Sequence, residues 1–304
     1  MNGIICIDKP AGFTSFDVIA KLRGILKMRR LGHAGTLDPM ATGVLPVFVG
    51  YATKACGILP DENKSYQAGF ALGKVSDTQD STGRILETHD IPGITKEQIQ
   101  NLCPTGEIMQ IPPMYSAVSV NGKRLYELAR EGKEIEREAR KIFIEKFLCE
   151  SFDPETGTGV LEISCSKGTY VRTLIHDMGQ SLGCGAVMTG LRRTSAGGFF
   201  LCDCHTLDEI QKLADENRIS EILIPIERVF SSLPEIHLNE NQTRHYRNGV
   251  KMSLSQFQEQ LMIGQNRYAV YGTPDGFIGT ALLDDEKQCL RIERNLCEPK
   301  EVKT

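Results

Sequence analysis

The residues best suited to chemistry lie in one glycine-rich stretch, residues 31–50 (LGHAGTLDPMATGVLPVFVG), where Asp38 is the only acidic side chain. Gly35 permits backbone angles that other residues rarely adopt, and Pro39 pushes the residue before it toward an extended conformation. The apolar run at residues 44–49 predicts a buried strand. The stretch therefore predicts a carboxylate held on a constrained loop beside a hydrophobic support, as a catalytic site requires. The alternative is an ordinary surface turn, because Asp-Pro and glycine are common in turns.

Four further motifs follow in order along the chain. They are KSYQAGFALGKVSDTQDSTG (64–83), QIPPMYSAVSVNGKRLYELAREG (110–132), SKGTYVRTLIHDMG (166–179) and LRRTSAG (191–197). Together with the Asp38 stretch they closely resemble, in the same order, the motifs of the TruB family, the bacterial tRNA pseudouridine-55 synthases. The resemblance extends from about residue 3 to about residue 200, and five ordered motifs make chance agreement implausible.

The resemblance implies an enzyme that isomerises the uridine at position 55 in the T loop of tRNA to pseudouridine. This reaction breaks the N-glycosidic bond, turns the uracil and joins C5 to the ribose, so it needs no cofactor and no metal. Asp38 matches the family's nucleophilic or charge-stabilising carboxylate, and Arg172 matches the guanidinium that holds it. Tyr66 matches the active-site aromatic residue. Stacking on uracil ranks first for its role, because a free tyrosine with a pKa near ~10 is a poor base.

The resemblance also implies a set of substrate contacts. His33 matches the residue that fills the space left when the target uridine is flipped out of the T loop. Lys64 matches a basic residue near the tyrosine. Residues 110–140 match an RNA-gripping insertion, which would place Lys123 and Arg124 on the phosphate backbone. The residues that match the lining of the nucleoside pocket are Asp80, Tyr170 and Leu191. Each of these residues has a structural alternative, such as a turn cap, a strand aromatic or a core leucine.

Both helices and strands are needed to position these residues. Three helices begin with capping boxes, namely Thr14 with Asp17, Thr95 with Gln98, and Thr206 with Glu209. The first helix has an apolar stripe at helical spacing, which consists of Phe16, Ile19, Leu22, Ile25 and Leu26. A fourth helix is predicted at residues 173–182, and strands are predicted at 3–8, 66–72, 141–148 and 160–165. The polar segment at residues 122–139 suits a protruding hairpin or helical flap.

The chain divides into two parts near residue 231, where the composition becomes linker-like (SSLP). We predict an α+β fold over residues 1–230, with a mixed, largely antiparallel central sheet and flanking helices. Residues 233–304 contain a short helix at 240–248 and candidate strands at 267–271, 277–283 and 289–294. This segment loosely resembles the small PUA-like β-barrel that binds RNA in many relatives of the family.

Composition sets limits on where the protein works. The chain has 304 residues, and no apolar run approaches the ~20 residues of a membrane span. The N-terminus lacks the pattern of a secretory signal. Ten scattered cysteines with no Cys-x-x-Cys pair indicate reduced thiols, and Cys202-x-Cys204-His205 lacks the second ligand pair of a zinc site. We therefore expect a cytoplasmic protein with no membrane contact, and the resemblance implies a monomer with tRNA as its partner.

The net charge of −4 argues against nonspecific binding to nucleic acid, but it leaves room for local basic patches. The candidate patches are Lys21, Arg23, Lys27, Arg29 and Arg30, then Lys123 and Arg124, then Arg192 and Arg193. The alternative for each patch is a solvated helix or loop surface.

Two other functions remain open. The first is a noncatalytic RNA-binding or tRNA-folding module, against which the joint presence of Asp38, Tyr66 and Arg172 argues. The second is an aspartate-based hydrolase or phosphotransferase that acts on small molecules. That enzyme would need an acidic, metal-binding cluster, and Asp77 and Asp80 are the only nearby acidic pair.

Overall fold

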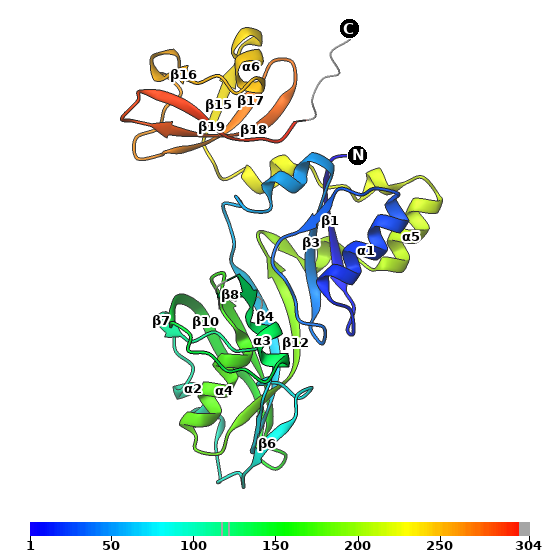
Figure 1. Ribbon diagram of the computed structural model, residues 1–304, viewed down its shortest axis with the longest axis vertical. Coiled ribbons are helices and arrows are strands. Elements are labelled where there is room, and N and C mark those ends of the chain that lie inside the picture. Colours follow the sequence, from blue (N-terminus) through cyan, green and yellow to red (C-terminus); the bar gives the residue numbers. More distant parts are fainter. Residues whose placement is uncertain (117, 121, 298–304) are drawn as a thin grey trace.

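The computed structural model describes residues 1–116, 118–120 and 122–297. A ten-stranded sheet forms the body of the elongated molecule, and a smaller sheet lies at the C-terminal end (Figure 1). The strands of the body are β1 (Gly3–Lys9), β2 (Leu31–His33), β3 (Thr42–Val49), β4 (Lys64–Leu72), β7 (Gly106–Gln110), β10 (Arg140–Asp153), β11 (Thr158–Cys165), β12 (Ala186–Ala196), β13 (Phe199–Phe200) and β14 (Cys204–His205).

The strand order is β14-β1-β3-β12-β4-β11-β10-β7, with β2 beside β3 and β13 beside β12. Only the pairs β1/β14 and β3/β12 are parallel among the pairs in this sheet. The prediction of a mixed, largely antiparallel sheet is therefore confirmed. Two short hairpins lie outside the sheet, and they pair β5 (Lys74–Ser76) with β6 (Ile85–Thr88) and β8 (Ser119–Val120) with β9 (Lys123–Arg124).

Helices cover the sheet in two groups. Helices α1 (Ser15–Leu26) and α5 (Leu207–Asp215) pack on the half formed by β1 and β3, whereas α2 (Lys96–Asn101) and α4 (Val171–Ser181) pack on the other half (Figure 1). The remaining helices are α3 (Leu125–Arg130), α6 (Glu240–Arg247) and the 3-10 turns η1 (Gly50–Ala55), η2 (Leu201–Asp203), η3 (Ile219–Glu221), η4 (Ile226–Phe230) and η5 (Leu254–Gln256). All three predicted capping boxes are present.

The predicted apolar stripe of α1 is wrong at one residue. Phe16 is 65% exposed, and the buried residues of the helix are Ser15, Val18, Ile19, Leu22 and Leu26. Ser15 occupies the inward position at the helix start because its hydroxyl bonds to the Asp38 loop, as described below. The predicted insertion folds as the β8–β9 hairpin followed by α3, so both elements of the predicted flap occur.

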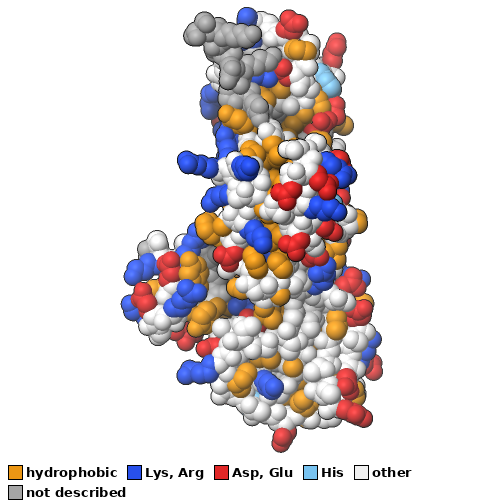
Figure 2. Space-filling view, turned by 90° about the vertical axis from the view of Figure 1, so that its right-hand side faces the viewer, with side chains coloured by type: hydrophobic (Ala, Val, Ile, Leu, Met, Phe, Trp, Pro, Cys, Tyr) orange, Lys and Arg blue, Asp and Glu red, His pale blue; other side chains and the backbone are white. Residues whose placement is uncertain are grey.

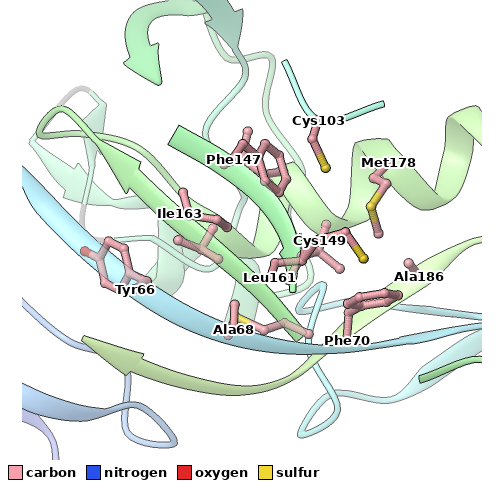
Figure 3. Close-up of a cluster of buried hydrophobic side chains, with 14 of the residues drawn as sticks. Tyr66, Ala68, Phe70, Cys103, Phe147, Cys149, Leu161, Ile163, Met178 and Ala186 are labelled. Carbon is pink, nitrogen blue, oxygen red and sulfur yellow. The ribbon is translucent and has the colours of Figure 1, made fainter. Parts of the chain in front are cut away.

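One core cluster lies between the sheet and helices α2 and α4. Strand β4 contributes Tyr66, Ala68, Phe70 and Leu72 to it, since alternate residues of a strand point to the same face. Tyr66 lies at the edge of this cluster, away from the aromatic ring of Phe70 (Figure 3). The hydrophobic core thus continues to the boundary of the site described below.

The C-terminal sheet is curled and has its own core. Its strands run in the order β15 (Glu235–Leu238), β17 (Arg267–Gly272), β18 (Gly276–Asp284), β19 (Cys289–Asn295) and β16 (Met252–Ser253), in agreement with the predicted PUA-like fold. Phe277 stacks on Phe230 with a centroid distance of 5.6 Å, which joins this sheet to the body. Within the described residues, no helix has the length and apolar character needed to cross a membrane.

The close packing of α4 on the sheet predicts opposite effects for two glycine-to-alanine changes. A Cβ at Gly179 would lie 2.1 Å from the backbone nitrogen of Ala186, whereas a Cβ at Gly24 of α1 would meet nothing within 4 Å. We expect Gly179→Ala to lower the free energy of unfolding by about 2 kcal/mol through overpacking. Gly24→Ala should raise it by about 0.5–1 kcal/mol through helix propensity. Urea denaturation measures both values, and equal effects would contradict the packing of α4.

Candidate active site

Asp38 begins a tight turn after β2. The Ala41 amide donates to the Asp38 carbonyl at 3.0 Å, and Pro39 occupies the second position of this turn. Gly35 has a φ of +77°, as its sequence context predicted, and Gly43 has a φ of +98°. A Cβ on Gly43 would lie 2.2 Å from the carbonyl oxygen of Arg193. Glycine is therefore required where the loop joins β3.

The segment between β1 and α1 holds the Asp38 loop on both sides. The buried Ser15 hydroxyl accepts from the Leu37 amide at 2.9 Å. On the other side of Asp38, the Pro39 carbonyl accepts from the Gly12 amide at 2.8 Å and from Lys9 Nζ at 3.3 Å. The backbone on either side of Asp38 is thus tied to residues 9–15, which restricts the directions available to the carboxylate.

Arg172 on α4 grips the Asp38 carboxylate with two nitrogens. Its Nε lies 2.9 Å from Asp38 Oδ2, and its Nη2 donates to Asp38 Oδ1 at 3.4 Å. The guanidinium also donates to the carbonyls of Thr78 at 3.0 Å and Tyr115 at 2.8 Å. Arg172 has a side chain that is only 6% exposed, whereas Asp38 keeps 37% of its side chain exposed toward the pocket. The carboxylate is therefore presented to a ligand from a buried cationic support.

Asp80 lies behind Arg172. One of its carboxylate oxygens lies 3.8 Å from Arg172 Nη1, and the other accepts from the Thr82 amide and from the hydroxyls of Thr78 and Thr82. We expected Asp80 along the wall of the nucleoside pocket, but it does not belong to the pocket lining. Its carboxylate bonds to the Thr78–Thr82 turn and lies beside the guanidinium. Asp80 therefore supports Arg172 from the side opposite the pocket.

A pocket of about 270 Å³ opens beside Asp38. Six of the predicted residues line it, namely Asp38, Lys64, Tyr66, Tyr170, Arg172 and Leu191. Among the described residues of this lining Asp38 is the only carboxylate, and Ser116, Ser166 and Thr169 add hydroxyls. Residues from all five sequence motifs therefore meet around this cavity.

Tyr66 lies next to Arg193, which is fully buried and donates to the carbonyls of Val44 at 2.7 Å and Gly35 at 3.0 Å. Burial raises the pKa of the Tyr66 phenol to about 12, although the positive charge of Arg193 works in the opposite direction. The phenol therefore keeps its proton at neutral pH in this structure. Its ring lines the pocket, where it can stack on a planar ligand.

Besides Asp80, three predicted residues lie outside the pocket lining. His33 pairs with Val47 in the sheet, and its Nδ1 is buried with no protein partner among the described residues. Burial lowers the pKa of this imidazole, and Arg193 lowers it further, so the ring is neutral at pH 7. Lys123 and Arg124 lie on β9 in the insertion, where both are exposed.

Burial and neighbouring charges act in opposite directions on the pKa of Asp38, and burial dominates. Burial raises the pKa of Asp38, and the Arg172 guanidinium lowers it. Burial also lowers the pKa of Lys9 to about 8, while the Asp38 charge opposes that effect. Lys64 shows the same lowering through burial. The charges of Arg172 and Lys9 thus offset part of the cost of ionising Asp38 away from water, and its pKa remains raised.

Lys9 is an important residue that the sequence analysis missed. It is fully buried, and its Nζ donates to the carbonyls of Pro10, Phe13 and Pro39. A lysine at the end of an otherwise apolar strand was the available signal, because such a side chain needs buried acceptors. Arg193 was assigned only to a basic surface patch. No group of three or more His, Cys, Asp or Glu side chains in the described ranges could hold a metal ion.

Comparison with known proteins decides the family. The model of the "TruB family pseudouridylate synthase (N terminal domain)" matches residues 23–171, and that of the "tRNA pseudouridylate synthase B C-terminal domain" matches residues 172–231. A tRNA pseudouridine synthase B from Clostridium perfringens (strain 13 / Type A) is 40% identical over 98% of this chain and 100% of the relative. The chain belongs to the TruB family of pseudouridylate synthases. A Heliobacterium mobile relative with the same name is 42% identical over 99% of this chain and 95% of its own.

Solved structures share the fold of this TruB-family chain. A chain in the crystal structure of a Cbf5-Nop10-Gar1 complex superposes with a TM-score of 0.72 at 24% identity, covering 97% of this chain and 85% of that one. A chain in the structure of an H/ACA RNP bound to a substrate RNA containing 2'-deoxyuridine gives a TM-score of 0.71 at 21% identity, with the same coverage. At these identities the likeness establishes the fold alone.

The geometry of Arg172 predicts that a conservative change will be costly. Arg172→Lys keeps the charge, but it cannot satisfy Asp38 and two buried carbonyls together, so we expect a loss of about 2 kcal/mol in the free energy of unfolding. Arg192→Lys is the matched control, because Arg192 also holds a carboxylate, that of Asp8, through two nitrogens. That pair is 40% and 30% exposed, so its loss should cost less than about 1 kcal/mol. Equal losses of unfolding free energy for the two variants in chemical denaturation would contradict the buried Arg172–Asp38 interaction.

Proposed function

We propose that this chain isomerises the uridine at position 55 in the T loop of tRNA to pseudouridine, with Asp38 as the nucleophile. The observation that carries the proposal is the pocket of about 270 Å³ into which a single carboxylate projects, supported by Arg172, in a member of a pseudouridylate synthase family. The names of the relatives supply the tRNA substrate. The reaction needs no redox step, so the chain's own side chains can carry it.

The target uridine must leave the stack of the T loop before the carboxylate can reach its ribose. In the proposed reaction the bond between N1 and C1' breaks, the uracil turns, and C5 bonds to C1'. The proton on C5 then leaves, and N1 gains a proton. Tyr66 and Leu191 would hold the ring between an aromatic and an apolar surface. Because the pKa of Tyr66 is raised to about 12 without RNA, stacking comes before proton transfer in its proposed role.

The RNA outside the pocket would be held by several parts of the chain. Lys64 would contact a phosphate near the target, His33 would fill the vacated space in the loop, and Tyr170 would contact the ring. The insertion would close over the T loop through Lys123 and Arg124. We further propose that residues 1–230 form the catalytic domain and that residues 233–304 add affinity and orientation. The core cluster that the C-terminal sheet has of its own supports that division. The protein would act as a monomer in the cytoplasm.

Replacement of one carboxylate tests the proposed function. Asp38→Asn keeps the shape of the side chain and removes its nucleophilic charge, so we expect no pseudouridine in treated tRNA while RNA affinity stays within about tenfold. Asp77→Asn is the matched control, because the Asp77 carboxylate accepts from the Arg84 amide in a neighbouring turn and is not part of the pocket lining as described. Nucleoside analysis of unmodified tRNA after incubation measures the product. Formation of pseudouridine by Asp38→Asn at the wild-type rate would exclude Asp38 as the nucleophile. Wild-type protein that binds tRNA without forming pseudouridine would favour the RNA-folding module.

The proposed insertion contacts predict a change in salt dependence. Substitution of Lys123 and Arg124 by alanine should weaken tRNA binding. The slope of log affinity against log salt concentration should become less steep by about 1.5, because each phosphate contact releases counterions. The yield of pseudouridine at saturating tRNA should stay near that of the wild type. Filter binding at several salt concentrations measures the slope. An unchanged slope would show that the hairpin does not contact the RNA backbone.

A further inference from the structure

The charge of this acidic chain is unevenly distributed. Residues 18–60 contain one acidic residue, Asp38, and six basic residues, whereas the whole chain has a net charge of −4. The basic residues of this segment are Lys21, Arg23, Lys27, Arg29, Arg30 and Lys54. The proposed catalytic chemistry uses only the aspartate, so the excess of positive charge calls for a separate explanation.

The structure leaves these six cations exposed and without carboxylate partners. All six side chains lie at the surface. In the described part of the chain none of them has an acidic oxygen within 4.0 Å. Elsewhere exposed cations are commonly paired, as Lys146 is with Glu162 at 2.6 Å and Arg218 with Glu221 at 2.7 Å. The charges of this segment therefore remain available to an external anion.

Two of these cations lie over one aromatic ring. The Arg30 guanidinium lies 4.4 Å from the centre of the Tyr51 ring, and Lys54 Nζ lies 5.3 Å from it. Arg30 Nε also donates to the Thr53 hydroxyl at 3.1 Å. Arg29 precedes Arg30 and is exposed beside it. We call Arg29, Arg30, Tyr51 and Lys54 the Tyr51 patch. Because the ring holds two of the cations, the patch offers ordered positive charge rather than a free stacking surface.

The patch and the pocket lie near opposite ends of β3. The Arg30 carbonyl accepts from the Gly50 amide at 2.9 Å, so the patch adjoins the end of β3. The other end of β3, Gly43, pairs with Arg193 beside the pocket. At 3.3 Å per residue, the strand separates the two places by about 20 Å. Figure 2 shows Lys and Arg side chains along the upper left edge of the body, with few acidic ones among them.

We propose that the Tyr51 patch binds the phosphate backbone of the same RNA whose uridine enters the pocket, at a part of that RNA about 20 Å from the target base. This inference rests on the proposed function. The contact is electrostatic and independent of sequence, because guanidinium and ammonium groups on phosphates carry no base information. The patch is separate from Lys123 and Arg124 of the insertion. It sets the orientation of the RNA and contributes to its affinity, while Asp38 and Arg172 act on the base.

Removal of two charges tests this proposal. The double variant Arg30→Gln, Lys54→Gln should bind full-length tRNA more weakly, by on the order of tenfold at low salt, and should flatten the salt slope by about 1.5. Pseudouridine formation at saturating tRNA should remain near the wild-type rate. A second variant, Arg30→Lys with Lys54→Arg, keeps both charges and should keep the wild-type slope. A thermal melt of each variant checks that the fold is intact.

The matched control removes two exposed cations from the opposite end of the molecule. Lys74→Gln with Arg84→Gln changes the β5–β6 hairpin, which lies at the far end from the C-terminal sheet (Figure 1). Its salt slope should equal that of the wild type. If this control flattens the slope as much as the patch variant does, net charge explains the effect and the proposal is overturned. An unchanged salt slope in the patch variant also overturns the proposal. An acidic protein would then be the partner that the Tyr51 patch fits. Both outcomes are read from tRNA binding and not from pseudouridine formation. Failure of the patch proposal can therefore be told apart from failure of the proposed function.

Discussion

The guanidinium of Arg172 joins parts of the chain that are far apart in sequence. It holds the Asp38 carboxylate on the loop after β2, the Thr78 carbonyl in the turn after β5, and the Tyr115 carbonyl at the start of the insertion. A buried guanidinium that lost any of these acceptors would carry an unpaired donor, which is costly in a low-dielectric interior. The position of the pocket carboxylate and the seating of the insertion therefore depend on one side chain.

The rest of the fold can be understood as support for that side chain. Close packing at Gly179 fixes α4 against β12, and this fixes the position from which Arg172 reaches the pocket. From the opposite side, Ser15 and Lys9 tie the backbone around Asp38. The two charged partners are thus placed by different halves of the sheet. The pairing of β12 with β3 and with β4 connects these two halves.

Local signals explain what the sequence predicted correctly. Capping residues such as Thr14 and Thr206 mark helix starts, and alternation from Tyr66 onward marks a strand, because both depend on near neighbours. The same reasoning misplaced Phe16, because the inward position at the helix start is taken by Ser15, whose hydroxyl bonds to Leu37, 22 residues farther along the chain. The residues that line the pocket were predicted from the family motifs and not from residue spacing.

The buried role of Lys9 and the position of Asp80 behind Arg172 could not be read from the sequence. Lys9 donates to carbonyls of a loop that returns 30 residues later, and Asp80 meets a guanidinium far along the chain. The most direct test of the account is a carbon-13 NMR titration of the Asp38 carboxyl group in wild type and in Arg172→Gln. We predict a pKa above the usual aspartate range in the wild type, because burial dominates, and a further rise in the variant, because the guanidinium no longer lowers it. Identical titrations in the two proteins would contradict the claim that Arg172 controls this carboxylate.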